Sequence, residues 1–178
     1  MRVALSLTTI TLSCVVLAGD HSDSPYGLGM MTFTSDNFCG NSSFEHETSA
    51  ELPFVADCQK LVDHLKSDGK YGYQFIGWDK DHLDSPYLEL GIMKTCAFGA
   101  KPLDTNDGPP VVTQGDAADV IQDAITKLST NNQVRGSGVM DCQVTDDNAR
   151  VLSWKGNWGK RKFSWQLYKP GSVPIIQF

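Results

Sequence analysis

The sequence predicts an α+β fold, a two-layer sandwich in which one mostly antiparallel sheet carries two helices on one face. Apolar residues recur at helical spacing in residues 53–66 and 116–128, and they alternate in several other segments. The elements follow the order helix, strands, helix, strands, which is typical of α+β domains. Four cysteines remain once residues 1–18 are set aside, and this even number predicts two disulfides.

The first helix is predicted over residues 53–66. Cys58, Leu61 and Leu65 lie on its apolar stripe, and Pro53 suits the first helical position. This stripe is expected to face the sheet.

The residues between the two helices predict strands and a loop. Residues 72–78 and 87–98 are each expected to form one strand. Residues 104–115 are rich in Pro and Gly and are expected to form a loop. The second helix follows over residues 116–128, with Asp116 as the expected cap.

The C-terminal part of the chain predicts further strands. Residues 134–144 alternate apolar and polar side chains, so they are expected to add an inward-facing strand to the sheet. Residues 151–154 and 163–168 are predicted to form a final antiparallel pair.

The N-terminus predicts export from the cell. In residues 1–18, one basic residue precedes an apolar run that ends at small residues, as in a secretory signal peptide. The run is shorter than the roughly 20 residues that a membrane span requires. We therefore expect a secreted, extracellular protein with an irregular leader over residues 19–37 and a single domain over residues 38–178.

The four remaining cysteines are Cys39, Cys58, Cys96 and Cys142. We expect them to form disulfides and to hold no metal or cofactor, because the chain has no Cys-x-x-Cys motif and no Cys/His cluster at ligand spacing. A bond from Cys39 to Cys58 would turn Cys58 away from the sheet. Cys58 is therefore predicted to pair with Cys96 or Cys142, and Cys39 with the cysteine left over.

Charge is distributed unevenly along the chain. Residues 19–147 hold 21 acidic and 8 basic residues, whereas residues 148–178 hold 6 basic residues and no acidic ones. Nucleic acid is therefore not an expected partner, because the body of the chain is strongly acidic and phosphate contacts require Lys and Arg.

The basic C-terminal region interleaves aromatic residues with cations, and two interpretations stay open. The region could form a surface that stacks on sugars or lies at an anionic membrane interface. Alternatively, its Trp side chains complete the core, as the usual burial of Trp suggests. The residues of the first hypothesis are Trp154, Lys155, Trp158, Lys160, Arg161 and Lys162.

Two short motifs follow Cys39. Asn41-Ser42-Ser43 is an N-glycosylation sequence in a chain expected to be secreted. Glu45-His46-Glu47 could suggest acid–base or metal chemistry, but neighbouring residues on a strand point to opposite faces. We interpret it as a solvated acidic turn and expect no catalytic residues.

Five segments that follow one another in the chain resemble a known family. In order, they are CGNSSFEHETS, PFVADC, TCAFG, DAADVIQDAI and GVMDC. Together they resemble the fungal "extracellular protein two" effectors, also called the necrosis-inducing factor domain. The resemblance covers residues 38–144 and leaves residues 146–178 as additional strands. It provides no catalytic residues, so the cysteines carry over as disulfide positions only.

The resemblance implies a small protein secreted by a fungus and acting in the extracellular space of a host plant, where some members provoke cell death. We expect a non-catalytic protein that binds a host or microbial component, whether protein, glycan or membrane surface. Related domains occur fused to chitinases that look like killer toxins, which implies an alternative role against the membranes of competitors. A small carbohydrate-active enzyme is the third hypothesis, since acidic residues are abundant.

Overall fold

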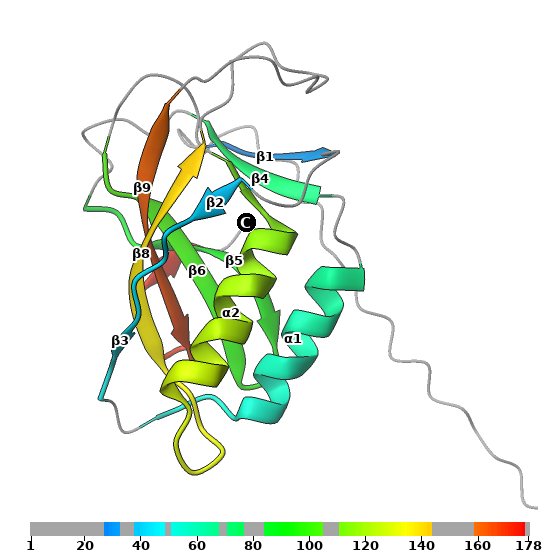
Figure 1. Ribbon diagram of the computed structural model, residues 1–178, viewed down its shortest axis with the longest axis vertical. Coiled ribbons are helices and arrows are strands. Elements are labelled where there is room, and N and C mark those ends of the chain that lie inside the picture. The colour runs from blue at the N-terminus through cyan, green and yellow to red at the C-terminus, as the bar shows by residue number, and fades with distance from the viewer. Residues whose placement is uncertain are drawn as a thin grey trace, which may run out of the picture.

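The computed structural model describes residues 27–32, 38–48, 51–67, 71–76, 84–104, 111–143 and 159–176. It confirms the α+β class, with two helices, mostly antiparallel sheets and two disulfides (Figure 1). The elements in chain order are β1 (Gly27–Thr32), β2 (Cys39–Gly40), β3 (Glu45–His46), α1 (Val55–Ser67), β4 (Tyr71–Ile76), β5 (Tyr87–Met93), β6 (Cys96–Pro102), β7 (Val111–Thr113), α2 (Gln114–Leu128), β8 (Gly136–Gln143), β9 (Lys160–Tyr168) and β10 (Ile175–Ile176). The predicted signal peptide, residues 1–18, lies outside the described residues.

The described strands form two sheets. The larger has seven strands in the order β10-β5-β6-β9-β8-β2, with β3 also paired to β8. Its neighbours run antiparallel except for β10 and β5, which are parallel. The smaller sheet has three antiparallel strands in the order β1-β4-β7. Because β7 leads directly into α2, the small sheet lies at the N-terminal end of that helix.

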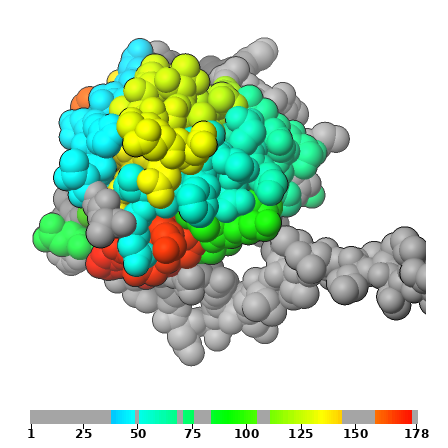
Figure 2. Space-filling view, turned by 90° about the horizontal axis from the view of Figure 1, so that it is seen from below, coloured from blue at the N-terminus to red at the C-terminus, as the bar shows by residue number. Residues whose placement is uncertain are grey.

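Both helices cover the same face of the large sheet (Figure 1). The apolar stripe predicted for the first helix is buried, including Cys58, Leu61 and Leu65. Gln59 of α1 donates a side-chain hydrogen bond to Gln122 of α2 at 3.1 Å, which links the two helices. The C-terminal residues lie on the side of the molecule opposite α2 (Figure 2). Neither described helix is long and apolar enough to cross a membrane.

Trp165 of β9 lies at the centre of the core. Its side chain is fully buried, and its ring stacks on that of Phe98 with centroids 6.3 Å apart. The Phe44 ring packs on it at 5.3 Å. A buried aromatic side chain removes about 150–250 Å² of surface from water. Trp165 therefore completes the core, as the second interpretation of the C-terminal region expected.

Residues 87–98 do not form one strand, as the alternation suggested. They form the hairpin of β5 and β6, which turns at Lys94 and Thr95. Lys94 has a φ of 52°, in the left-handed region that suits a tight turn. The residue that interrupts the apolar alternation therefore marks the turn.

Two segments expected to be irregular contribute strands. The predicted leader contains β1, which pairs with β4 from Gly27↔Ile76 to Thr32↔Tyr71. The predicted Pro/Gly loop ends in β7, whose three residues are all buried. Both strands belong to the small sheet, so their pairing partners decide their conformation more than their local sequence does.

The second helix is capped by Thr113 rather than by Asp116. The Thr113 hydroxyl accepts a hydrogen bond from the Asp116 N–H at 3.0 Å, and the Asp116 carboxylate accepts one from the Thr113 N–H at 3.0 Å. This reciprocal pair is a capping box, in which Asp116 occupies the third helical position. The helix therefore begins two residues earlier than predicted.

Candidate functional site

A groove of about 390 Å³ separates α2 from residues 39–44, the segment that leads from β2 to β3. Figure 1 shows this segment running beside the helix. The volume lies within the range of small-molecule sites, which is about 300–1,000 Å³. The groove is lined by Cys39, Gly40, Asn41, Ser42, Phe44, Asp116, Asp119, Val120, Gln122, Asp123 and Lys127.

At one end of the groove, Asp116 fastens the segment to the helix. Its buried carboxylate accepts hydrogen bonds from the backbone N–H groups of Phe38 at 3.0 Å and Cys39 at 2.9 Å. Burial raises the pKa of this carboxyl above its ordinary value, although the hydrogen bonds from Cys39, Thr113 and Phe38 lower it in part. Asp116 therefore ties both walls of the groove together.

At the other end, Lys127 joins the same two walls. Its ammonium lies 3.8 Å from the centre of the Phe44 ring, a cation–π contact, and 2.6 Å from the Asp123 carboxylate. Asp116 and Lys127 lie eleven positions apart on α2, which corresponds to a rise of about 16 Å along the helix axis.

Two of the three carboxylates that line the groove are paired with lysines. Asp119 lies 3.2 Å from Lys66 of α1, and Asp123 pairs with Lys127. The groove also offers the amide of Gln122 and the hydroxyl of Ser42. Its polar groups therefore include the carboxylates of Asp119 and Asp123, whose charges the lysines balance. Such a surface suits a neutral polar ligand.

The segment opposite α2 is held by β8. The Ser43 N–H donates to the Val139 carbonyl at 2.8 Å, and the Ser43 hydroxyl accepts from the Val139 N–H at 2.9 Å. Asn41 has a φ of 51°, a conformation that Asn tolerates better than most residues. A Cβ at Gly138 would overlap the carbonyl oxygen of Ser43, so only glycine allows this close approach.

The disulfides join Cys58 to Cys96 and Cys39 to Cys142. This is one of the two arrangements that the sequence analysis left open. The first ties α1 to β6, with its Cα atoms 5.1 Å apart. The second joins directly opposed residues of β2 and β8. Because Cys39 also lines the groove, this bond fixes one end of its wall.

The Glu45-His46-Glu47 motif does not converge on one point. Glu45 and His46 are exposed and form β3. Glu47 accepts hydrogen bonds from Arg135 at 3.1 Å and Gln166 at 3.0 Å, which is a structural contact across the sheet. Among the residues that the structure describes, no group of three His, Cys, Asp or Glu side chains could hold a metal ion.

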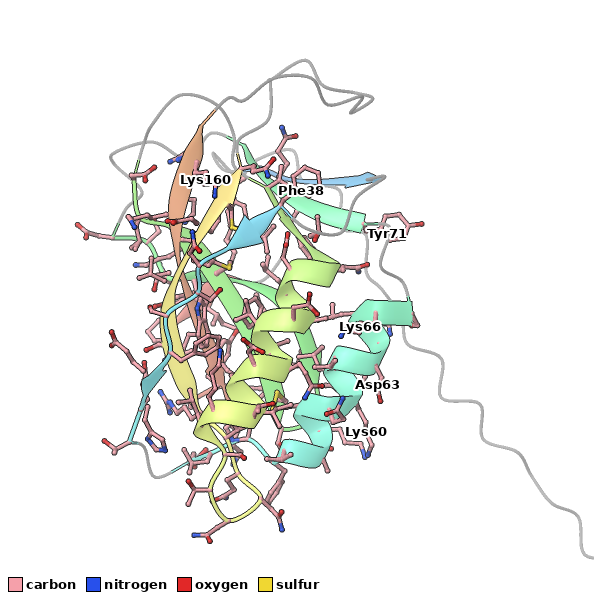
Figure 3. The ribbon with its side chains drawn as sticks, viewed as in Figure 1. Phe38, Lys60, Asp63, Lys66, Tyr71 and Lys160 are labelled. Atoms are coloured by element: carbon pink, nitrogen blue, oxygen red, sulfur yellow. A yellow bond between two sulfur atoms is a disulfide. The ribbon has the colours of Figure 1, made fainter. Side chains whose placement is uncertain are left out.

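The predicted C-terminal binding surface needs a correction at Arg161. Its side chain is only 3% exposed, and its Nε lies 2.7 Å from the Asp104 carboxylate. Lys162 is exposed and pairs with Asp141 at 3.3 Å, and Lys160 is exposed near the start of β9 (Figure 3). The other members of the hypothesis, residues 154, 155 and 158, lie outside the described part of the chain.

Sequence reasoning missed the groove, which has no local motif. Its defining contacts join Asp116 to Cys39 and Lys127 to Phe44, pairs that lie far apart in the chain. One signal was available, because Thr113 and Asp116 have the spacing of a capping box.

Comparison with known proteins identifies the domain that holds this groove. The profile of the Hce2 family, described as pathogen effector and necrosis-inducing factor, matches residues 38–142. The chain belongs to this family of pathogen effectors. The resemblance drawn from the five segments is therefore confirmed, and the match spans all four cysteines and every residue that lines the groove.

One relative of this chain is a much longer protein. It is named probable chitinase LysM18, from Penicillium expansum, and is 26% identical over 131 residues. The aligned region covers 73% of this chain and 8% of the length of that protein. The effector domain is thus similar to a small part of a large protein.

Proposed function

We propose that this effector is secreted and acts outside the cell by binding a host component without catalysis. The observation that carries the proposal is the family match, which covers both disulfides and the whole groove. Two disulfides in a domain of this size support an oxidising, extracellular setting. Plant tissue is the setting that the resemblance to fungal effectors favours.

The two exposed carboxylates of the groove support binding rather than hydrolysis, and the buried Asp116 carboxylate is occupied by hydrogen bonds from Phe38, Cys39 and Thr113. Asp119 and Asp123 are 62% and 56% exposed and each is paired with a lysine. General acid–base catalysis depends on carboxyl groups whose pKa is tuned by a water-poor environment. The four cysteines are bonded and therefore offer no thiolate nucleophile.

The test is infiltration of the purified, oxidised protein into leaves, combined with capture of partners from extracellular fluid on immobilised protein. We expect a saturable partner whose intact mass is the same before and after capture. Reducing sugar released from cell-wall polymers, and lost in an Asp119→Asn/Asp123→Asn double variant, would contradict a non-catalytic role. Asp84→Asn is the matched control, since Asp84 is exposed, precedes β5 and does not line the groove.

The relative named as a chitinase favours a second candidate function, an antimicrobial role against competitors. A domain that accompanies a chitin-degrading protein could act on microbes whose walls contain chitin. Growth inhibition of yeast by the purified protein, with no response in leaves, would support this role over the first. A leaf response without growth inhibition would support the first.

A further inference from the structure

Asn41 lies where an attached sugar would meet the groove. It begins the sequence Asn41-Ser42-Ser43, which is an acceptor for N-linked glycosylation. Asn41 is exposed, and both Asn41 and Ser42 line the groove. A glycan on this side chain would therefore start at the wall of the groove, with α2 opposite.

The groove has the chemistry that a neutral sugar requires. Sugar hydroxyl groups both donate and accept hydrogen bonds, and the groove offers the amide of Gln122 and the carboxylates of Asp119 and Asp123. Both carboxylates are already balanced by lysines, so no ionic partner is required. Apolar surface is confined to a few positions such as Val120 and Phe44.

We propose that Asn41 carries an N-linked glycan and that its first sugars occupy the groove between residues 39–44 and α2. In the transfer step, the Asn41 Nδ2 attacks the anomeric carbon of a lipid-linked oligosaccharide pyrophosphate. A carbon–nitrogen bond forms, the bond from the anomeric carbon to the pyrophosphate oxygen breaks, the amide proton passes to a base of the transferase, and the lipid pyrophosphate leaves. The proposal rests on passage through the secretory pathway, which is part of the proposed function.

The folded structure indicates when transfer takes place. The Ser43 hydroxyl, which the acceptor sequence requires, is bonded to the N–H of Val139 at 2.9 Å. Cys39 is bonded to Cys142, 103 residues further along the chain. Both partners are synthesised later than Asn41, so the sugar is added before β8 pairs with this segment. Folding then brings α2 alongside the attached glycan.

The experiment compares three forms of the protein secreted from a eukaryotic host. The first carries the complete glycan. The second is trimmed with an endoglycosidase that leaves a single N-acetylglucosamine. The third is treated with peptide N-glycosidase, which removes the whole glycan and converts Asn41 to Asp. The variant Asn41→Asp, which never carries the glycan, has the same covalent structure as the third form and serves as its control.

If the first sugars occupy the groove, the complete and trimmed forms should melt about 2–4 °C above the third form and the Asn41→Asp variant. Amide hydrogen exchange of α2 near Gln122 should slow by several fold in the two glycosylated forms. Secretion without a glycan at Asn41 would overturn the proposal. Equal melting temperatures in all forms would overturn it too, because the glycan would then project into solvent.

A pair of variants locates the contact. Asp119→Ala removes a carboxylate that lines the groove and should abolish most of the glycan-dependent rise in melting temperature. Asp84→Ala removes an exposed carboxylate that precedes β5 and does not line the groove, and it should leave the rise intact. An unchanged rise in Asp119→Ala would overturn the assignment of the groove.

The proposal and the proposed function fail differently. Retention of the protein inside the cell would contradict the proposed function. Secretion of an active protein whose Asn41 is unmodified, or whose glycan has no effect on stability, would contradict only the inference about the groove. In a further outcome, a soluble sugar raises the melting temperature of the unglycosylated form while the attached glycan has no effect. That result would assign the groove to an external ligand and overturn the proposal that the Asn41 glycan occupies it.

Discussion

The Asp116 carboxylate accepts a hydrogen bond from the backbone N–H of Cys39 at 2.9 Å, although the two residues lie 77 positions apart. The same carboxylate accepts from the N–H groups of Phe38 and Thr113 and from the Thr113 hydroxyl. One buried side chain therefore completes the cap of α2 and holds the start of β2. Since Cys39 is also half of a disulfide, this contact fixes how the outer strand lies against the helix.

Replacing Asp116 with Asn should destabilise the domain by about 1–3 kcal/mol. The amide would place an NH₂ donor where an oxygen now accepts hydrogen bonds, so buried N–H or O–H groups would lose their partner. The free energy of unfolding from urea titration measures the effect. Asp123→Asn removes an exposed carboxylate from the same helix and should cost less than about 1 kcal/mol. Equal losses in the two variants would contradict the role assigned to Asp116.

The stability difference between the wild type and Asp116→Asn should depend on pH. Burial raises the pKa of Asp116 above its ordinary value of 3.8, so the folded protein binds this proton more tightly than the unfolded chain does. The resulting stabilisation is complete below the ordinary value and is lost as the pH rises through the higher folded value. The deficit of the variant should therefore grow as the pH falls from 7 towards 4. A deficit that shrinks over this range would show that the hydrogen bonds to the carboxylate outweigh its burial.

Gly138 and Gly40 should respond differently to an added methyl group. A Cβ at Gly138 would overlap the Ser43 carbonyl oxygen and lie 2.9 Å from the Trp165 ring, whereas a Cβ at Gly40 would meet nothing within 4 Å. Gly138→Ala should therefore cost about 1–3 kcal/mol through overpacking. Gly40→Ala should change stability by less than about 0.5 kcal/mol. Thermal unfolding of both variants checks this, and a stable Gly138→Ala would show that residues 39–44 can move away from β8.

The sequence predicts the helices well because each has one face in the core. The spacing of Cys58, Leu61 and Leu65 follows from the helical repeat, and the same repeat excludes a bond from Cys58 to Cys39. The pattern fails at Lys94, because a tight hairpin keeps the alternation of apolar residues on both sides of the turn. Local periodicity therefore identifies buried faces more reliably than it identifies where a strand ends.

The groove and the buried Arg161 were not predictable in the same way. The groove depends on a side chain that bonds backbone N–H groups of a distant segment, and backbone groups carry no sequence signal. Arg161 lies between two lysines, so the run suggests a basic surface. Strand alternation places it on the same face as Phe163 and Trp165, where Asp104 neutralises it. The alternation of buried side chains along the strand was the available signal for a buried Arg161, but the two neighbouring lysines made the segment look like a basic surface.

The two disulfides should differ in their susceptibility to reduction. Cys39 is half-buried and lines the groove, whereas Cys58 and Cys96 are fully buried between α1 and β6. A small dithiol should therefore reduce Cys39–Cys142 first in the folded protein, because thiol–disulfide exchange requires access to a sulfur atom.

Mild reduction followed by alkylation and peptide mapping should label Cys39 and Cys142 before the other pair. In urea, where burial no longer protects Cys58 and Cys96, both disulfides should be reduced at similar rates. The Cys39–Cys142 bond closes a loop of 103 residues, whereas Cys58–Cys96 closes a loop of 38. The chain-entropy model therefore predicts that removing Cys39–Cys142 lowers the free energy of unfolding by roughly 1 kcal/mol more. Labelling of Cys58 and Cys96 first in the folded protein would show that α1 opens before β2 leaves β8.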